Sequence, residues 1–295
     1  MAALLLPDFA LILLGLGLYR WLKWPEAFWS TLEKMVFFIL FPALLFHSVV
    51  RTSFDLARTT ALLETVFAAT FCGVILGYAI RLFTRISPLT FASGVQCAFR
   101  FNSYIGLALA ARIGGDEGLA YMAVIIGFNV PFCNIAAVWG LARHSELSLW
   151  RELSRNPLIV ATLSGLLFNL VGWHPPEVIM TTLQRLGSAS IALGLIAVGA
   201  GLRLRGVHEA RLAAAWWLLL KMLVNPLAAW MLGRYLQLEP LQLKIAILFA
   251  GLPTASSAYI LATRMGGNGP LVAFLISAST LLSIVTLPLW LSLII

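Results

Sequence analysis

Two polar interruptions in otherwise apolar stretches are the parts of this chain best suited to chemistry. They are Asn102-Ser103 and Pro253-Thr254-Ala255-Ser256-Ser257. Pro253 lacks a backbone donor and clashes with the preceding turn, so it ends a helix. Asn102, Ser103 and Thr254 are good N-cap residues and are suited to starting a new one. We therefore expect two broken helices whose second halves begin at polar residues.

A helix that starts inside a membrane directs free N–H groups and a partial positive charge at its own N-terminus. Two such ends that meet at mid-membrane would form an anion site. Two cations deep in apolar segments support this expectation. Arg100 lies about 18 Å into its segment at 1.5 Å per residue, and Lys221 precedes an Asn225-Pro226 break. Each could balance the charge of a bound carboxylate, or could instead cap a backbone carbonyl as part of the scaffold.

Three further features have weaker implications. Asn129 could line the same cavity, although hydrogen bonding between helices explains it equally well. His47, like Lys221, is a candidate proton-linked residue, against the alternative of a satisfied interfacial histidine. The three cysteines lack metal-like spacing, and we expect no metal site and no cofactor.

These residues lie in a chain that is too apolar to be soluble. Hydrophobic residues make up 61% and charged residues 11% of its 295 residues. A transmembrane helix needs about 20 apolar residues, and the sequence divides into ten such ranges. They are about 5–23, 27–50, 60–83, 88–112, 117–142, 157–173, 181–203, 212–235, 241–264 and 269–294. The connections are short, so residues 1–295 should form a single membrane domain.

The chain repeats itself at an offset of 152 residues. Residues 110–115 (AARIGG) return as residues 262–267 (ATRMGG), and the two polar interruptions fall at equivalent positions. Repeat one covers about residues 1–150 and repeat two about residues 155–295. Because each repeat holds five spans, an odd number, the second must be inserted upside down. The predicted fold is all-α and integral to the membrane, with ten transmembrane helices in two inverted five-helix repeats and with broken, crossing helices 4 and 9.

The net charge of +8 does not indicate a nucleic-acid partner, because the basic residues are spread over many connections without forming a patch. Twelve of them follow odd-numbered spans and six follow even-numbered spans. By the positive-inside rule this bias places both termini on the non-cytoplasmic side of the inner (plasma) membrane.

What the sequence lacks also restricts the function. Its acidic residues fall at span ends or in connections, so no carboxylate is evident for cation exchange. The motifs of intramembrane enzymes are missing as well, with no HExxH and no GxSG with a partner histidine. We therefore expect a carrier of anions, and not an enzyme.

Three stretches carry a family resemblance: Phe38-Ile39-Leu40-Phe41-Pro42-Ala43-Leu44-Leu45-Phe46, Phe101-Asn102-Ser103-Tyr104-Ile105-Gly106-Leu107, and Gly251-Leu252-Pro253-Thr254-Ala255-Ser256-Ser257-Ala258-Tyr259 with the later Met265-Gly266-Gly267-Asn268. Over essentially the whole chain, the sequence resembles the bacterial auxin efflux carrier family, which is related to plant PIN-formed carriers and includes malonate and malate permeases. In that family Asn102 matches the polar residue after the fourth-span break, and Pro253 matches the ninth-span proline. Phe101 departs from the pattern, because plant relatives carry proline there, so the first break could be held open less rigidly.

The resemblance implies the fold of bile acid sodium symporters, in which spans one, two, six and seven form a scaffold and the rest a mobile core. It also implies an organic anion as substrate and a homodimer formed through the scaffold. The leading hypothesis is thus a secondary transporter of small organic anions (a mono- or dicarboxylate, an auxin-like acid or malonate/malate), with membrane lipid as its other partner. A sodium-coupled bile-acid-like symporter, an anion channel and a non-transporting sensor remain as alternatives.

Overall fold

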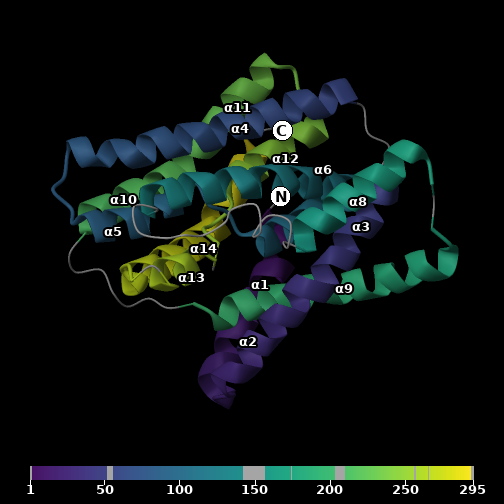
Figure 1. The fold of residues 1–295 in the computed structure, drawn as a ribbon, viewed down its shortest axis with the longest axis horizontal. Helices are drawn as coiled ribbons and strands as arrows, with labels where there is room; N and C mark the ends of the chain where they lie inside the picture. The colour runs from purple at the N-terminus through teal and green to yellow at the C-terminus, as the bar shows by residue number, and fades with distance from the viewer. Residues whose placement is uncertain are drawn as a thin grey trace.

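The structure is a computed structural model that describes residues 2–51, 56–141, 157–173, 175–202, 210–255, 257–264 and 266–293. Every element in these residues is helical, which confirms the expected all-α class (Figure 1). The first half contains α1 (Ala2–Leu22), α2 (Glu26–Met35), the π-helical η1 (Val36–Leu40), α3 (Phe41–Arg51), α4 (Leu56–Ala79), the 3-10 helix η2 (Ile80–Leu82), α5 (Pro88–Val95), the 3-10 helix η3 (Gln96–Ala98) and α6 (Ser103–Leu141). The second half contains α8 (Pro157–Val171), α9 (Glu177–Ala200), α10 (Arg211–Leu219), the π-helical η5 (Leu220–Val224), α11 (Asn225–Tyr235), α12 (Pro240–Gly251), α13 (Ser257–Arg264) and α14 (Gly269–Ser292).

The helical segments begin and end close to the ranges expected from hydropathy. The main difference is α6, which continues for 39 residues across the expected boundary between the fourth and fifth ranges. Within α6 the backbone leaves helical geometry at Gly115, with φ 56° and ψ −140°. Glycine adopts a positive φ without steric cost, so Gly115 is where the chain can change direction.

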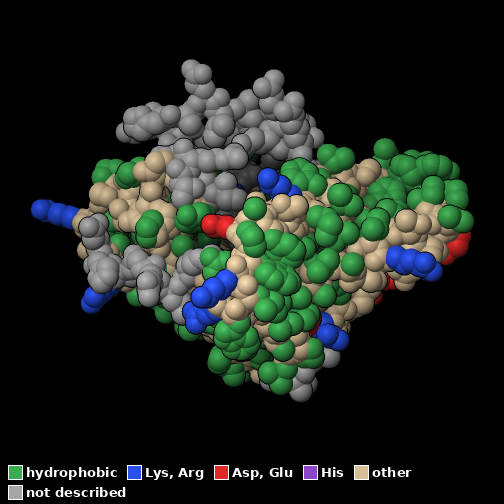
Figure 2. All heavy atoms as spheres, turned by 90° about the horizontal axis from the view of Figure 1, so that it is seen from below, with side chains coloured by type: hydrophobic (Ala, Val, Ile, Leu, Met, Phe, Trp, Pro, Cys, Tyr) green, Lys and Arg blue, Asp and Glu red, His purple; other side chains and the backbone are tan. Residues whose placement is uncertain are grey.

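The described helices are suited to a membrane. Six helical stretches are long and apolar enough to cross one: Glu26–Arg51, Thr59–Leu82, Pro88–Ala137, Glu177–Ala200, Arg211–Tyr235 and Gly269–Ser292. Hydrophobic side chains cover most of the described surface visible in Figure 2, with Lys and Arg scattered singly among them. Large apolar side chains that are more than half exposed include Phe38, Phe71, Leu167 and Val285. Exposed apolar area on this scale is typical of a lipid-facing surface.

The helices form two groups by their contacts. The first, which we call the scaffold group, consists of α1, α2, η1, α3, α8 and α9, in which α1 packs on α9, α3 packs on α8 and α9, and η1 packs on α3, α8 and α9. Gly15 of α1 lies directly against the backbone of Ile196, and Gly199 of α9 against that of Ile12, a close approach that small residues allow. The second, the core group, consists of α4, α5, α6 and α10–α14, in which α12 packs on α4, α6, α11 and α14. Helix α6 contacts both groups, since it also packs on α1, α3, α8 and α9.

Candidate functional site

The two helix breaks meet in the core group. The first lies between η3, which ends at Ala98, and α6, which begins at Ser103. The second lies between α12, which ends at Gly251, and α13, which begins at Ser257. The backbone N–H of Asn102 donates to the carbonyl of Pro253 at 2.8 Å. The Phe101 ring packs edge-on against Phe249 with centroids 4.5 Å apart. The first break thus forms without a proline of its own, because the second break supplies its backbone and aromatic partners.

The two broken helices run in opposite directions. Gly114, near the end of the first straight segment of α6, lies against Leu241 at the start of α12. After α13, the backbone N–H of Asn268 donates to the Ser93 hydroxyl of α5 at 2.9 Å. Each broken helix therefore ends beside an early part of the other, and the half-helices α6 and α13 leave the crossing in opposite directions.

Asn102 caps α6 as the sequence predicts. Its side-chain oxygen accepts from the backbone N–H groups of Tyr104 at 3.0 Å and Ile105 at 3.2 Å. The matching expectation for Thr254 is wrong, because α13 begins three residues later, at Ser257. The Thr254 hydroxyl instead donates across the crossing to the Cys97 carbonyl at 2.9 Å. The Thr254 side chain therefore bonds to a helix end of the other repeat.

Two side chains from one helical span hold the C-terminal ends of the half-helices that lead into the crossing. The Asn225 amide donates to the Ala98 carbonyl at 2.8 Å, and the Lys221 ammonium donates to the Ala250 carbonyl at 3.3 Å. A cation at a helix C-terminus is favourable because the last carbonyls carry partial negative charge. Ala98 and Ala250 are equivalent at the 152-residue offset. The π-helical η5 and the start of α11 therefore supply caps to both repeats.

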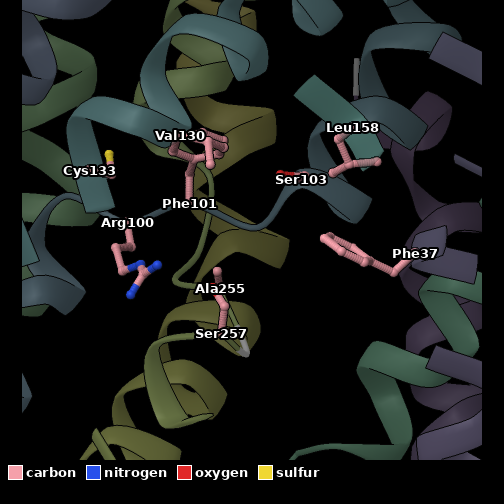
Figure 3. A pocket seen from close by; sticks show the side chains of 9 residues that line it. All are labelled: Phe37, Arg100, Phe101, Ser103, Val130, Cys133, Leu158, Ala255 and Ser257. Atoms are coloured by element: carbon pink, nitrogen blue, oxygen red, sulfur yellow. The ribbon is translucent and has the colours of Figure 1, made fainter. Parts of the chain in front are cut away.

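A cavity of about 140 Å³ lies beside the crossing, between the two groups of helices. Figure 3 shows its side chains, with Arg100 and Phe37 on opposite sides and with Ala255 and Ser257 below. The lining residues are Phe37, Arg100, Phe101, Ser103, Val130, Cys133, Leu158, Ala255 and Ser257. Among these nine, Arg100 is the one charged residue. Ser103 and Ser257 are the first residues of α6 and α13, so two helix N-termini adjoin the same cavity.

Arg100 is held by a glutamine one turn before it. Its guanidinium Nη1 donates to the Gln96 side-chain oxygen at 2.9 Å. The Gln96 amide donates in turn to the Ala258 carbonyl of α13 at 3.2 Å. Arg100 is 9% exposed, so its charge is largely removed from solvent. Gln96 thus connects the positioning of Arg100 to the half-helix of the other repeat.

The structure brings only some of the predicted site residues to the cavity. Arg100, Ser103 and Ser257 line it, whereas Asn102, Pro253 and Thr254 build the crossing behind it. Ser256 lies outside the described residues.

The remaining predicted residues are not part of the cavity lining. Lys221 is 2% exposed and bonds to Ala250 as described above. Asn129 is fully buried and accepts from the Thr70 hydroxyl at 3.1 Å. His47, in α3 of the scaffold group, is 3% exposed.

Sequence reasoning missed the apolar half of the cavity and the support of Arg100. Phe37 and Leu158 come from the scaffold group, and an isolated apolar residue in an apolar helix carries no recognisable signal. Phe37 also lies in a π-helical segment, an irregularity frequent at functional sites but invisible in the sequence. Gln96 could have been found, because a polar residue four positions before an arginine within one expected helical span is a natural partner.

Comparisons with known proteins agree with this membrane architecture. A family model described as "Membrane transport protein" matches residues 134–291, which is more than half of the chain. A "Putative malonate transporter" of Rhizobium meliloti is 26% identical over 298 residues, covering 96% of this chain and 92% of that protein. An "Uncharacterized transporter" of Methanothermobacter thermautotrophicus is 28% identical over 267 residues, covering 88% and 87% of the two chains. "Uncharacterized transporter YfdV" of Escherichia coli is 24% identical over 304 residues, covering 97% and 95%. The family resemblance drawn from the sequence motifs is confirmed.

Proposed function

The chain belongs to the membrane transport protein family, and from this premise we propose that it is a secondary transporter of small organic anions. The observation that carries the proposal is the composition of the cavity. A largely buried arginine and the first residues of two helices adjoin one space of about 140 Å³. Both the guanidinium and the helix N-termini favour a negative charge in that space.

We propose that Arg100 is the group that balances the charge of the bound acid. Its planar fork of donors matches the geometry of a carboxylate. One of its donors is bound to the Gln96 side-chain oxygen, and a guanidinium carries five N–H donors in all. The hydroxyls of Ser103 and Ser257 lie at the same cavity and are suited to the second oxygen or to a second carboxylate. We propose that Lys221 does not contact the acid and instead stabilises the crossing through its bond to the Ala250 carbonyl.

The size of the cavity favours a short acid. Pockets for drug-sized ligands usually have about 300–1,000 Å³, so 140 Å³ suits a molecule well below that size. A C3–C4 mono- or dicarboxylate fits this limit better than an aromatic acid such as an auxin. The name of the Rhizobium meliloti relative refers to a C3 dicarboxylate, which is consistent with this size class.

We propose that transport occurs by alternating access, with the core group moving against the scaffold group. The cavity suits such a cycle because Phe37 and Leu158 line it from the scaffold group while Arg100 and Ser257 line it from the core group. The opposite directions of the two broken helices support the proposed arrangement of ten spans in two inverted repeats. We further propose that the protein lies in the inner membrane with both termini on the non-cytoplasmic side, and that it dimerises through the scaffold group.

Counterflow in proteoliposomes tests the proposal. Vesicles are loaded with one of a panel of mono- and dicarboxylates, and uptake of the same labelled acid is measured for wild type, Arg100→Gln and the control Arg85→Gln. Arg85 is exposed and lies in the connection between α4 and α5. We expect saturable exchange of a short acid by wild type and Arg85→Gln, with a strongly raised KM in Arg100→Gln.

The outcomes separate the competing functions. Exchange that requires sodium on both sides would favour a sodium-coupled symporter. Single-channel current without counterflow would favour an anion channel. If folded wild-type protein exchanges none of the acids, the assignment of an anion substrate is wrong.

A further inference from the structure

One wall of the cavity is an aromatic ring from the scaffold group. Phe37 lies in η1, and its ring points into the cavity on the side opposite Arg100 (Figure 3). Arg100 is the one charged residue among the nine that line the cavity. An acid whose carboxylate binds at Arg100 therefore has the rest of its molecule directed across the cavity towards Phe37. The space that the Phe37 ring leaves free decides how large that remainder can be.

The π-helical η1 fixes the position of this ring. Val36 is fully buried and packs against Gly194 of α9. The next residue after Phe37, Phe38, is 59% exposed on the outer face of η1, and the two rings meet edge-on with centroids 5.1 Å apart. Because η1 packs on α3, α8 and α9, the Phe37 ring belongs to the scaffold group, whereas Arg100 belongs to the core group. An acid held by the core must therefore fit past a wall that the core does not carry with it.

Phe37 differs from the other large apolar side chains of the lining. Phe101 is 4% exposed and packs against Phe249 inside the crossing. Leu158 is 3% exposed. Phe37 is only partly buried and lines the cavity from a separate turn of helix. Truncating Phe37 therefore enlarges the cavity without taking the crossing apart.

The volume of the cavity leaves no room for a second aromatic ring on the substrate. An apolar cavity of about 150 Å³ in a protein interior binds one benzene molecule. The cavity of about 140 Å³ is of that size, so a phenyl ring and the carboxylate attached to it do not fit together. Phe37→Ala removes one phenyl ring from the wall, which opens a space of the size that such an acid lacks.

We propose that Phe37 sets the upper size limit of the transported acid. Its ring occupies the side of the cavity that the substituent of a larger acid would need, while Arg100 binds the carboxylate from the opposite side. Phe37 acts by excluding volume and does not bind the charged group. The substrate class is thus short mono- or dicarboxylates without a bulky substituent. This inference rests on the proposed transport of organic anions, and it assigns the size limit to one side chain.

Pairs of acids that differ by one phenyl group test the inference. Malonate is paired with phenylmalonate and acetate with phenylacetate, and the pair used is the one whose short member wild type exchanges. Each acid competes with counterflow of the labelled short acid, and the ratio of the two inhibition constants gives the preference for the short acid. The variant is Phe37→Ala, and the control is Phe38→Ala, which removes the neighbouring exposed ring.

The expected change in preference follows from the size of the deletion. One methylene in an apolar pocket changes discrimination by about 10–200-fold. Removing a whole ring from the wall should therefore lower the preference for the short acid by at least about tenfold in Phe37→Ala. We expect Phe38→Ala to keep the wild-type preference, because its ring does not line the cavity.

A graded variant keeps the test valid if Phe37→Ala does not fold. Phe37→Leu leaves a smaller apolar side chain at the same place, so its preference should lie between those of wild type and Phe37→Ala. A general loss of packing would lower the thermal stability of the variants and weaken both acids of a pair alike. The ratio of the two inhibition constants would then stay at the wild-type value, which separates a structural role from a limit on size.

Three results would overturn the inference. One is a wild type that binds the phenyl-substituted acid as tightly as the short acid, because no size limit then exists. Another is an unchanged preference in folded Phe37→Ala or Phe37→Leu. The third is an equal change in Phe38→Ala, which would attribute the effect to η1 as a whole. Wild type without counterflow of any acid would contradict the carrier function itself, and it is distinguishable because the other three results all require exchange by wild type.

Discussion

Replacing Asn102, the residue that caps α6, tests whether the N-terminus of α6 contributes to substrate binding. Asn102 accepts from two backbone N–H groups, those of Tyr104 and Ile105, and is 3% exposed. Replacing an N-cap Asn by Ala typically costs about 0.5–2 kcal/mol. In Asn102→Ala, the first turn of α6 would lose this organisation next to Ser103, which lines the cavity. If the whole cost appears in binding, substrate affinity falls by about two- to thirtyfold.

A charged replacement of Asn102 separates the effect on the helix cap from the effect on anion binding. Asn102→Asp keeps an acceptor for the two N–H groups, and a negative charge at a helix N-terminus adds about 0.3–1 kcal/mol of stability. The same charge repels a bound anion. At an assumed separation of about 6 Å and an effective dielectric constant of about 20, this repulsion is about 3 kcal/mol. Because Asn102 is 3% exposed, burying that charge costs more stability than the helix end returns, so Asn102→Asp should unfold below the wild-type temperature while binding acid about a hundredfold more weakly.

The assay pairs thermal unfolding in detergent with the KM of counterflow. Asn268→Ala is the matched control, because Asn268 caps α14 by accepting from the Leu271 N–H at 3.0 Å and does not line the cavity. We expect Asn102→Ala and Asn268→Ala to lose similar stability, with KM raised only in the first. Wild-type affinity in Asn102→Asp would refute the reasoning, since it would place the anion away from the start of α6.

Two further predictions concern residues that hold the crossing and its exit. Lys221→Met removes the ammonium from the Ala250 carbonyl, which should cost about 1.5–3 kcal/mol of stability and leave the KM of the folded protein nearly unchanged. Thermal unfolding and counterflow are measured beside Lys34→Met, a change at an exposed lysine. A rise of KM in Lys221→Met alone would instead assign Lys221 to the substrate. Gly115→Ala places a side chain at φ 56° and ψ −140°, which should cost about 1–3 kcal/mol of folding stability. The yield of folded protein is compared with that of Gly201→Ala, since Gly201 has an ordinary φ of −77°. Equal yields would contradict a requirement for glycine at residue 115.

The helix breaks could be placed from the sequence because each contains a residue with a local preference, although the first break is also held by contacts with the second broken helix. Pro253 cannot continue a helix, and Asn102 is suited to starting one, whichever residues pack around them. The apolar ranges likewise depend only on neighbouring residues, and the observed helices follow them closely. The anionic character of the candidate substrate also came from residue types, through the buried cations and the polar helix starts.

The roles of the individual polar residues depended on packing. Arg100 and Lys221 both appear in the sequence as cations within apolar segments. Only the structure directs Arg100 to the cavity and Lys221 to the end of α12. Thr254 is a suitable N-cap by type, but the Cys97 carbonyl lies within reach of its hydroxyl once the two broken helices cross.

Asp8 of α1, which is 4% exposed in the structure, shows the same division most clearly. Along the chain it is an acidic residue near a helix start, and nothing nearby indicates that it is buried. Its carboxylate accepts from the Arg112 guanidinium, which is 104 residues away on a helix of the core group. The sequence by itself determined the helices, their breaks and the sign of the expected ligand, since propensity and hydropathy act over a few residues. Only the tertiary structure decided which polar groups meet, because those contacts join distant segments whose relative placement is set by packing.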